Sequence, residues 1–103
     1  MDERRILEIL KTGKVSFHYP LKAYYAPGTG GFGVSVPKRN FKRAVKRNLL
    51  KRRTREAFRL NATGQAGACD LFVYYIGKQI EDYGRIEKSM VAVLADMAAG
   101  QAD

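Results

Sequence analysis

The stretch KRNFKRAVKRNLLKRRTREAFR, residues 38–59, predicts one long helix from Asn40 to about Leu60. This helix joins two apolar segments of strand length, residues 32–36 and residues 70–76. Positions four, seven and eight residues apart share one side of this helix and would pack on a sheet. They are Leu50, Thr54, Ala57 and Phe58. Two parallel strands need a crossover connection, and a helix of this length supplies one. We therefore expect both strands to lie in one sheet with the helix packed against it.

The same stretch carries most of the positive charge of the chain. It holds 11 of the 19 Lys and Arg residues and one acid, Glu56, whereas the rest of the chain has 8 basic and 9 acidic residues. Like charges crowded in this way oppose a compact state by self-repulsion, and a polyanion compensates for them. We therefore expect the helix to bind nucleic acid.

The side of the helix opposite the apolar positions would present donors that suit phosphate oxygens. These residues are Asn48, Lys51, Arg52, Arg55 and Arg59. A merely solvated basic helix is the alternative, but such helices usually mix charges so that residues four apart attract each other. A membrane surface is disfavoured because the apolar side of this helix is needed for the core.

The remaining segments predict a small α+β domain over residues 1–103. We expect a helix over residues 3–10 that stops at Gly13, a basic helix capped by Asn40 and ended by residues 61–64, and a last helix capped by Asp82. The apolar positions of the last helix are Ile86, Met90, Val93, Leu94 and Met97. The expected strands are residues 15–18, 21–26, 32–36 and 70–76.

These elements follow the order αβββαβα and predict a two-layer sandwich with a mixed four-stranded sheet. Residues 70–76, DLFVYYI, form a continuous apolar run, which indicates a central strand buried on both faces. Residues 28–33, GTGGFG, resemble a phosphate-binding loop, but a strand rather than a helix follows, so we expect a hairpin loop. A crossover is right-handed by default.

Few residues in the chain could act as catalysts. One cysteine, Cys69, allows no internal disulfide, and with one histidine, His18, it cannot complete a zinc site of four Cys and His ligands. The acids lie mostly at chain ends, at caps or among arginines, where they suit metal-assisted hydrolysis poorly. No apolar run approaches the roughly 20 residues of a membrane span. We expect a cytoplasmic protein that binds a polyanion without a membrane and without catalytic residues of its own.

The order RNLLKRRTREAFR from Arg47 resembles the signature of the bacterial ribonuclease P protein component. This family supplies the small basic subunit that works with a catalytic RNA in removing the 5′ leader from precursor tRNA. The similarity extends through GVSVPKR at residues 33–39 and LKTG at residues 10–13, and Leu49 replaces the usual third signature residue, Arg. The resemblance implies a fold similar to the second domain of ribosomal protein S5, with a left-handed crossover made by the signature helix.

The resemblance also implies two RNA-binding sites. The catalytic RNA would contact the signature helix and the segment before it, at Lys38, Arg39, Lys42, Arg43, Arg47, Asn48, Lys51, Arg52 and Arg55. The single-stranded leader would lie in a cleft between the first helix and the sheet, lined by Ile6, Leu10, Lys22 and Tyr24. Lys22 and Tyr24 share one face of a strand, so an aromatic ring can stack on a base while a lysine meets a phosphate. Ordinary sheet packing is the alternative for Tyr24.

In such an enzyme Mg²⁺ bound mainly by the RNA subunit would catalyse the cleavage. The chain would then be an accessory subunit of an endoribonuclease. The implied partners are the ribonuclease P RNA and precursor tRNA, with no DNA. A noncatalytic RNA-binding or ribosome-associated protein is the alternative. A DNA-binding module is disfavoured, because the apolar side of the helix opposes deep insertion into a groove.

Overall fold

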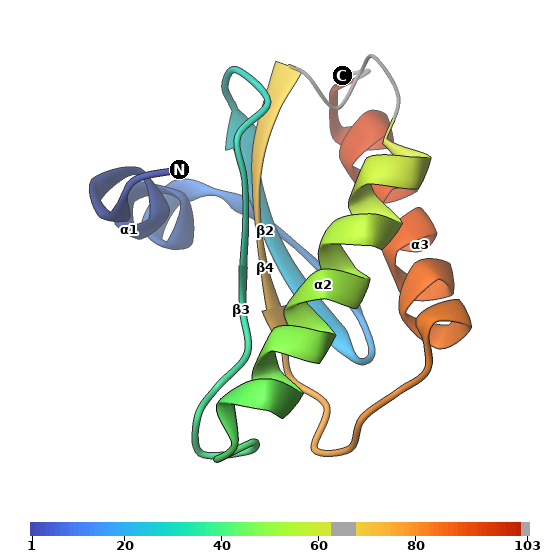
Figure 1. Ribbon diagram of the computed structural model, residues 1–103. Helices are drawn as coiled ribbons and strands as arrows, with labels where there is room; N and C mark the ends of the chain where they lie inside the picture. Colours follow the sequence, from blue (N-terminus) through green and yellow to red (C-terminus); the bar gives the residue numbers. More distant parts are fainter. Residues whose placement is uncertain (63–67, 102–103) are drawn as a thin grey trace.

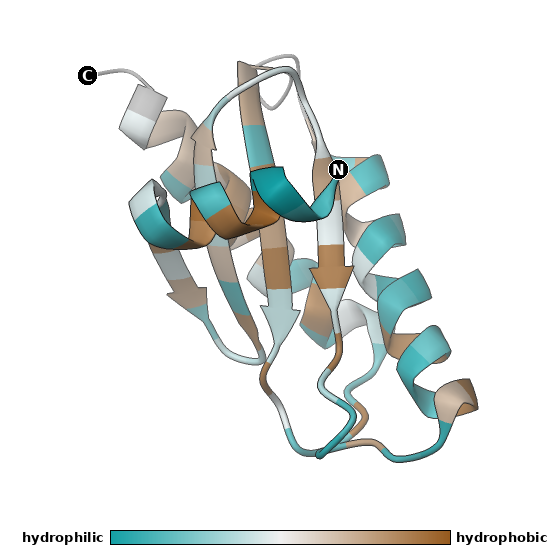
Figure 2. Cartoon of the chain, turned by 90° about the vertical axis from the view of Figure 1, so that its left-hand side faces the viewer, coloured by the Kyte–Doolittle hydropathy of each residue, from teal (hydrophilic) through white to brown (hydrophobic). Residues whose placement is uncertain are grey.

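The computed structural model describes residues 1–62 and 68–101 and contains one mixed sheet with helices on both faces (Figure 1). Its elements are α1 (Glu3–Thr12), β1 (Lys14–His18), β2 (Leu21–Pro27), β3 (Phe32–Ser35), α2 (Ala44–Asn61), β4 (Cys69–Tyr75) and α3 (Tyr83–Gln101). Helices α2 and α3 cover one face, and α1 crosses part of the other (Figures 1 and 2). The predicted α+β class and element order are confirmed.

The sheet order is β1-β2-β4-β3, with β3 and β4 parallel and the other two pairs antiparallel. Strand β4 is therefore internal, as its apolar run predicts. The predicted hairpin of β2 and β3 is wrong, because β4 lies between them. A strand that is apolar on both faces is best covered inside a sheet, and here β4 takes that place between β2 and β3.

The connection from β3 through α2 to β4 is left-handed (Figures 1 and 2). The general preference for right-handed crossovers therefore fails here, and the handedness implied by the family resemblance is confirmed. As a result, the basic helix runs beside the edge strand β3, with α3 as its other neighbour (Figure 1).

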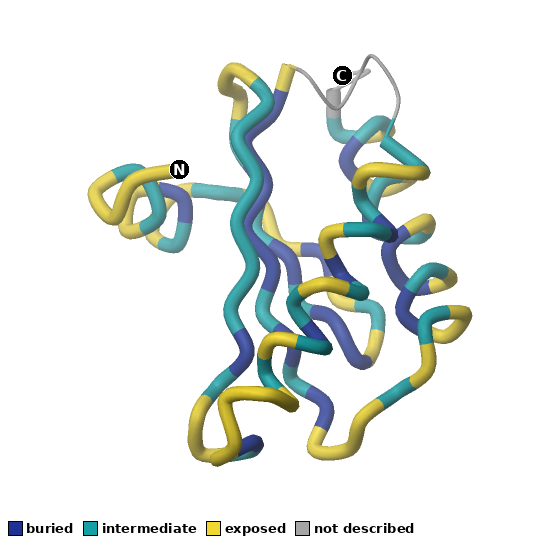
Figure 3. The backbone as a smooth tube through the Cα atoms, viewed as in Figure 1, coloured by how far each residue is buried: buried dark blue, intermediate teal, exposed yellow. Residues whose placement is uncertain are grey.

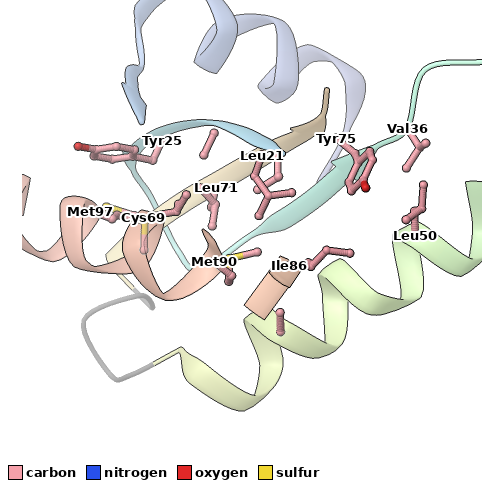
Figure 4. Close-up of a cluster of buried hydrophobic side chains, with 14 of the residues drawn as sticks. Leu21, Tyr25, Val36, Leu50, Cys69, Leu71, Tyr75, Ile86, Met90 and Met97 are labelled. Atoms are coloured by element: carbon pink, nitrogen blue, oxygen red, sulfur yellow. The ribbon is translucent and has the colours of Figure 1, made fainter. Parts of the chain in front are cut away.

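The core lies between the sheet and the pair α2 and α3 (Figures 3 and 4). Alternate residues of β2 and β4 point into it, and they include Leu21, Tyr25, Leu71 and Tyr75. The predicted apolar face of α3 is confirmed: Ile86, Met90, Val93 and Met97 are buried, and Leu94 is partly buried. The predicted cap is also present, because the Arg85 backbone N–H donates to Asp82 Oδ1 over 2.8 Å.

Candidate nucleic-acid interface

Helix α2 packs on the sheet through the predicted face. Leu50, Thr54 and Ala57 are fully buried, and the Thr54 hydroxyl donates to the Leu50 carbonyl over 2.8 Å. Phe58 is partly buried against Phe32, with ring centroids 4.3 Å apart. The apolar side of α2 is therefore fixed in the core, and the opposite side is left to solvent (Figure 3).

The predicted basic ridge lies on that solvent side. Asn48, Arg52, Arg55 and Arg59 are exposed, and Lys51 is half-buried. Glu56 forms an ion pair with Arg59, so the one acid of the stretch neutralises the last arginine of the ridge. Within the described part of the chain, no carboxylate bonds to Arg52 or Arg55. The centre of the ridge therefore keeps its charge for a partner.

The helix begins later than its sequence predicts. Its N-cap is Arg43, and the expected cap, Asn40, lies in a turn in which the backbone N–H groups of Asn40 and Phe41 donate to the Pro37 carbonyl over 3.2 and 3.3 Å. Phe41 is buried and packs against Tyr75, with ring centroids 5.9 Å apart. Insertion of Phe41 into the core favours a turn at residues 38–43 in place of the first turn of helix.

Arg47 stabilises this turn from inside the helix. Its Nη1 donates to the carbonyls of Phe41 and Lys42, each over 2.8 Å. The turn presents four further residues that were predicted to bind RNA, and all four are exposed: Lys38, Arg39, Lys42 and Arg43. Arg47 is half-buried and holds the turn in place, whereas its four neighbours point their charge outward.

A basic residue that the sequence did not single out joins this end of the interface. Lys78 lies in the loop after β4 and, with Pro37, Arg39, Asn40 and Ile76, lines a cavity of about 360 Å³. The loops after β3 and β4 meet because parallel neighbours end at the same edge of a sheet. Lys78 could therefore have been proposed once those strands were paired.

The other candidate surface is the face of the sheet that α1 crosses (Figure 2). Lys22 and Tyr24 are half-buried there, and Lys22 Nζ lies 5.6 Å from the centroid of the Tyr24 ring. Tyr24 meets Tyr74 edge to face at 6.0 Å, and Tyr74 meets Phe72 at 5.1 Å. Phe72 and Tyr74 were not predicted, although their alternation along β4 already places them on one face.

Helix α1 sits over this face through Ile9, which is fully buried. Ile6 and Leu10 are four residues apart and half-buried along one margin of α1, and Arg5 lies on the opposite margin. Arg5 contacts Pro27 and Asp70, near the end of β2 and the start of β4. The margin with Ile6 and Leu10 therefore lies on the side of α1 away from Pro27 and Asp70, and Lys22 and Tyr24 lie on the face of the sheet that α1 crosses.

A buried carboxylate fixes α1 to the sheet. Asp70 accepts hydrogen bonds from Arg5 Nε over 2.7 Å, from the Gly31 N–H over 2.8 Å and from the Thr29 N–H over 3.1 Å. A Cβ at Gly28 would overlap this carboxylate, so the glycine-rich loop wraps around a side chain of its own protein. Burial alone would raise the pKa of Asp70, but the bonds from Arg5, Gly31 and Thr29 together outweigh it and lower that pKa.

Replacing Asp70 by Asn is expected to lower the free energy of unfolding at neutral pH by about 3 kcal/mol, because it leaves Arg5 without its buried partner. The ionised carboxylate stabilises the fold fully above its ordinary pKa, 3.8, and this contribution is lost as the pH falls through the lowered pKa of the folded state. Urea unfolding at a series of pH values should therefore show the difference between wild type and Asp70→Asn shrinking below about pH 4.

The matched control is Glu8→Gln, which removes the exposed partner of the same arginine and should cost less than about 1 kcal/mol. An equal loss of stability in both variants would contradict the role of the buried carboxylate. So would a difference in unfolding free energy between wild type and Asp70→Asn that does not change with pH.

The single histidine of the sequence bonds to an acid on α3. His18 Nε2 and the Ser16 hydroxyl both bond to Asp96 Oδ2, each over 2.7 Å, and thereby join β1 to α3. Across residues 1–62 and 68–101, no group of three His, Cys, Asp or Glu side chains could hold a metal ion. Over the same ranges, no helix is both long enough and apolar enough to cross a membrane.

A family model and a curated relative both match this chain. The family model described as Ribonuclease P matches residues 1–98. A ribonuclease P protein component of Porphyromonas gingivalis is 47% identical over 55 residues, a match that covers 48% of this chain and only 40% of that relative.

Two solved structures share the fold. The RNase P protein of Staphylococcus aureus superimposes with a TM-score of 0.77 at 25% identity, covering 93% of this chain and 91% of the other. The fold is also that of the RNase P protein of Thermotoga maritima, with a TM-score of 0.77, 24% identity and coverage of 93% and 94%. With a family model matched over nearly its whole length, the chain belongs to the ribonuclease P protein family.

Proposed function

We propose that this chain is the protein subunit of ribonuclease P, an RNA-based endoribonuclease that removes the 5′ leader from precursor tRNA in the bacterial cytoplasm. The observation that carries the proposal is the packing of α2. Its apolar side is held in the core while Arg52 and Arg55 face solvent without a carboxylate bonded to them among the described residues. Membership of the family and the names of the relatives support the same function.

In this proposal the catalytic RNA docks on α2 and on the turn before it. Arg52 and Arg55 grip phosphate oxygens from the helix, and Lys38, Arg39 and Lys42 do so from the turn. Arg47 acts by a different route, since its guanidinium holds the carbonyls of the turn. Leu49, where the family signature has Arg, is half-buried and supplies no phosphate contact of that kind.

The protein contributes binding and orientation to the reaction. The catalytic Mg²⁺ would be held mainly by the RNA subunit, where it would supply the hydroxide that attacks the phosphate. The basic ridge offsets the electrostatic repulsion between the two RNA molecules. The precursor can therefore bind the catalytic RNA at a lower concentration of salt cations.

The 5′ leader binds the opposite face of the sheet, beside α1. Tyr24 stacks on one base while Lys22 meets a neighbouring phosphate. Ile6 and Leu10 provide an apolar wall along the margin of α1. The complex of the chain with its RNA subunit should therefore bind leader-bearing precursor more tightly than mature tRNA. Equal affinity for the two would contradict the assignment of this face to the leader.

Replacing Tyr24 by Ala should weaken binding of leader-bearing precursor by about 1–3 kcal/mol and leave binding of mature tRNA unchanged, because only the leader loses a stacking partner. Dissociation constants of the complex with both RNAs measure the effect. Tyr24→Phe keeps the ring and should bind almost as well as wild type. A loss of affinity that is equal for both RNAs would instead assign Tyr24 to packing of the sheet.

A further inference from the structure

The edge strand β1 carries a large exposed aromatic side chain, Phe17, with 57% of its surface accessible. Phe17 pairs with Lys22 in the antiparallel ladder of β1 and β2, and Val15 pairs with Tyr24. Directly opposite residues in such a ladder point to the same face of the sheet. Phe17 therefore extends the surface of Lys22 and Tyr24 to the outer edge of the sheet.

A single exposed phenylalanine is common on protein surfaces and needs no explanation by itself. Here, however, Phe17 continues a series of rings that become more exposed toward β1. Phe72 is 6% exposed, Tyr74 and Tyr24 are half-buried, and Phe17 follows at the edge. Tyr74 packs edge to face on both Phe72 and Tyr24, whereas no other ring contacts Phe17 in residues 1–62 and 68–101. Its face is thus open for stacking.

The charge of this surface suits a single-stranded polyanion. Lys22 lies directly across from Phe17, and the carboxylate on the same face, Asp70, is already bonded to Arg5. Diagonal neighbours in an antiparallel ladder, such as Phe17 and Tyr24, lie roughly 7–8 Å apart, a span that adjacent nucleotides of an extended strand can bridge. An aromatic ring beside a lysine is the usual combination for binding single-stranded nucleic acid.

A second ring for stacking cannot come from the two α1 residues predicted to contact the leader, because Ile6 and Leu10 are aliphatic. We propose that Phe17 stacks on a base of the single-stranded leader, so that the leader runs from Tyr24 past Lys22 to the edge strand β1. This inference rests on the proposed function, because it assigns a further specificity residue to the same leader site. Bases farther along the leader reach Phe17, and its contribution therefore appears only when the leader is long enough.

The first test measures how tightly the complex with the RNA subunit binds precursors whose leaders increase in length. Phe17→Ala should weaken binding of long-leader precursor by about fivefold or more and leave the shortest leaders and mature tRNA unchanged. Val15→Ala is the matched control, since Val15 is 53% exposed on the same strand face but has no ring; it should change binding by no more than about twofold. Affinity of Phe17→Ala equal to that of wild type at every length would overturn the inference.

The second test uses the absence of tryptophan from the sequence. In Phe17→Trp the new side chain is the only tryptophan of the protein, so its fluorescence reports on this position alone. Long-leader precursor should quench the emission, and mature tRNA should not. An emission that does not respond to the leader, or a concentration-dependent self-association that Phe17→Ala abolishes while leader binding persists, would overturn the inference and assign Phe17 to a protein contact.

Different results would exclude the leader site as a whole and the role of Phe17 alone. If wild type binds leader-bearing and mature tRNA equally, the leader site itself is wrong. If wild type prefers the leader and Tyr24→Ala loses that preference while Phe17→Ala keeps it at every length, only the role of Phe17 is wrong.

Discussion

Replacing Arg52 and Arg55 together by Ala is expected to weaken binding of the RNA subunit by roughly one to two orders of magnitude at moderate salt. Both side chains are exposed, and neither bonds to a carboxylate in the described residues, so their loss removes phosphate contacts without disturbing the core. Each lost phosphate contact should also reduce the slope of log affinity against log salt by about 0.7–0.9. Filter binding or fluorescence titration over a series of salt concentrations measures both effects.

The control for this pair removes two positive charges from another helix. Arg85 and Lys88 are exposed on α3, so Arg85→Ala combined with Lys88→Ala lowers the net charge equally. This control should reduce affinity far less, because it leaves the α2 ridge intact. If both double variants weaken binding to the same extent, the RNA responds to overall charge, and α2 is not the docking site. Arg47 is a poorer choice, because its loss would also release the turn at Phe41 and Lys42.

Leu50→Ala is expected to lower the free energy of unfolding by about 2–5 kcal/mol, because it leaves a cavity beneath the basic helix. Leu50 is fully buried in the same core cluster as Val36, the residue that follows β3 (Figure 4). Urea denaturation followed by circular dichroism gives the loss. RNA binding by the folded fraction should change little, since Leu50 is on the core side of α2.

Val45 provides the comparison, because it lies on the same helix and is 75% exposed. Val45→Ala should change the free energy of unfolding by no more than about 0.5 kcal/mol. Equal destabilisation by Leu50→Ala and Val45→Ala would mean that the two sides of α2 have been assigned wrongly.

The faces of α2 could be predicted because they depend on local spacing. A period of 3.6 residues places Leu50, Thr54 and Ala57 on one side whatever the rest of the chain does. The start of the helix could not be predicted in the same way. Asn40 is a good N-cap by residue type, but the burial of Phe41 against Tyr75 is a tertiary contact that overrides it.

The pairing of strands required information that no short segment contains. Residues 28–33 looked like a hairpin because their glycines suit a turn, whereas the insertion of β4 between β2 and β3 follows from the apolar character of a distant strand. For the same reason the sequence placed Lys22 and Tyr24 together but missed Phe72 and Tyr74, which come from β4. The handedness of the crossover came from the family resemblance, since general rules favour the opposite hand.

In the function that we propose, this protein binds a catalytic RNA and thereby promotes removal of the 5′ leader. The most direct measurement follows cleavage of a precursor tRNA by the cognate RNA subunit at low Mg²⁺, with and without the purified chain. We expect the chain to stimulate cleavage strongly, and the variant lacking Arg52 and Arg55 to require a much higher concentration for the same rate. No stimulation by the wild-type chain, or cleavage by the protein in the absence of the RNA subunit, would contradict the proposed function.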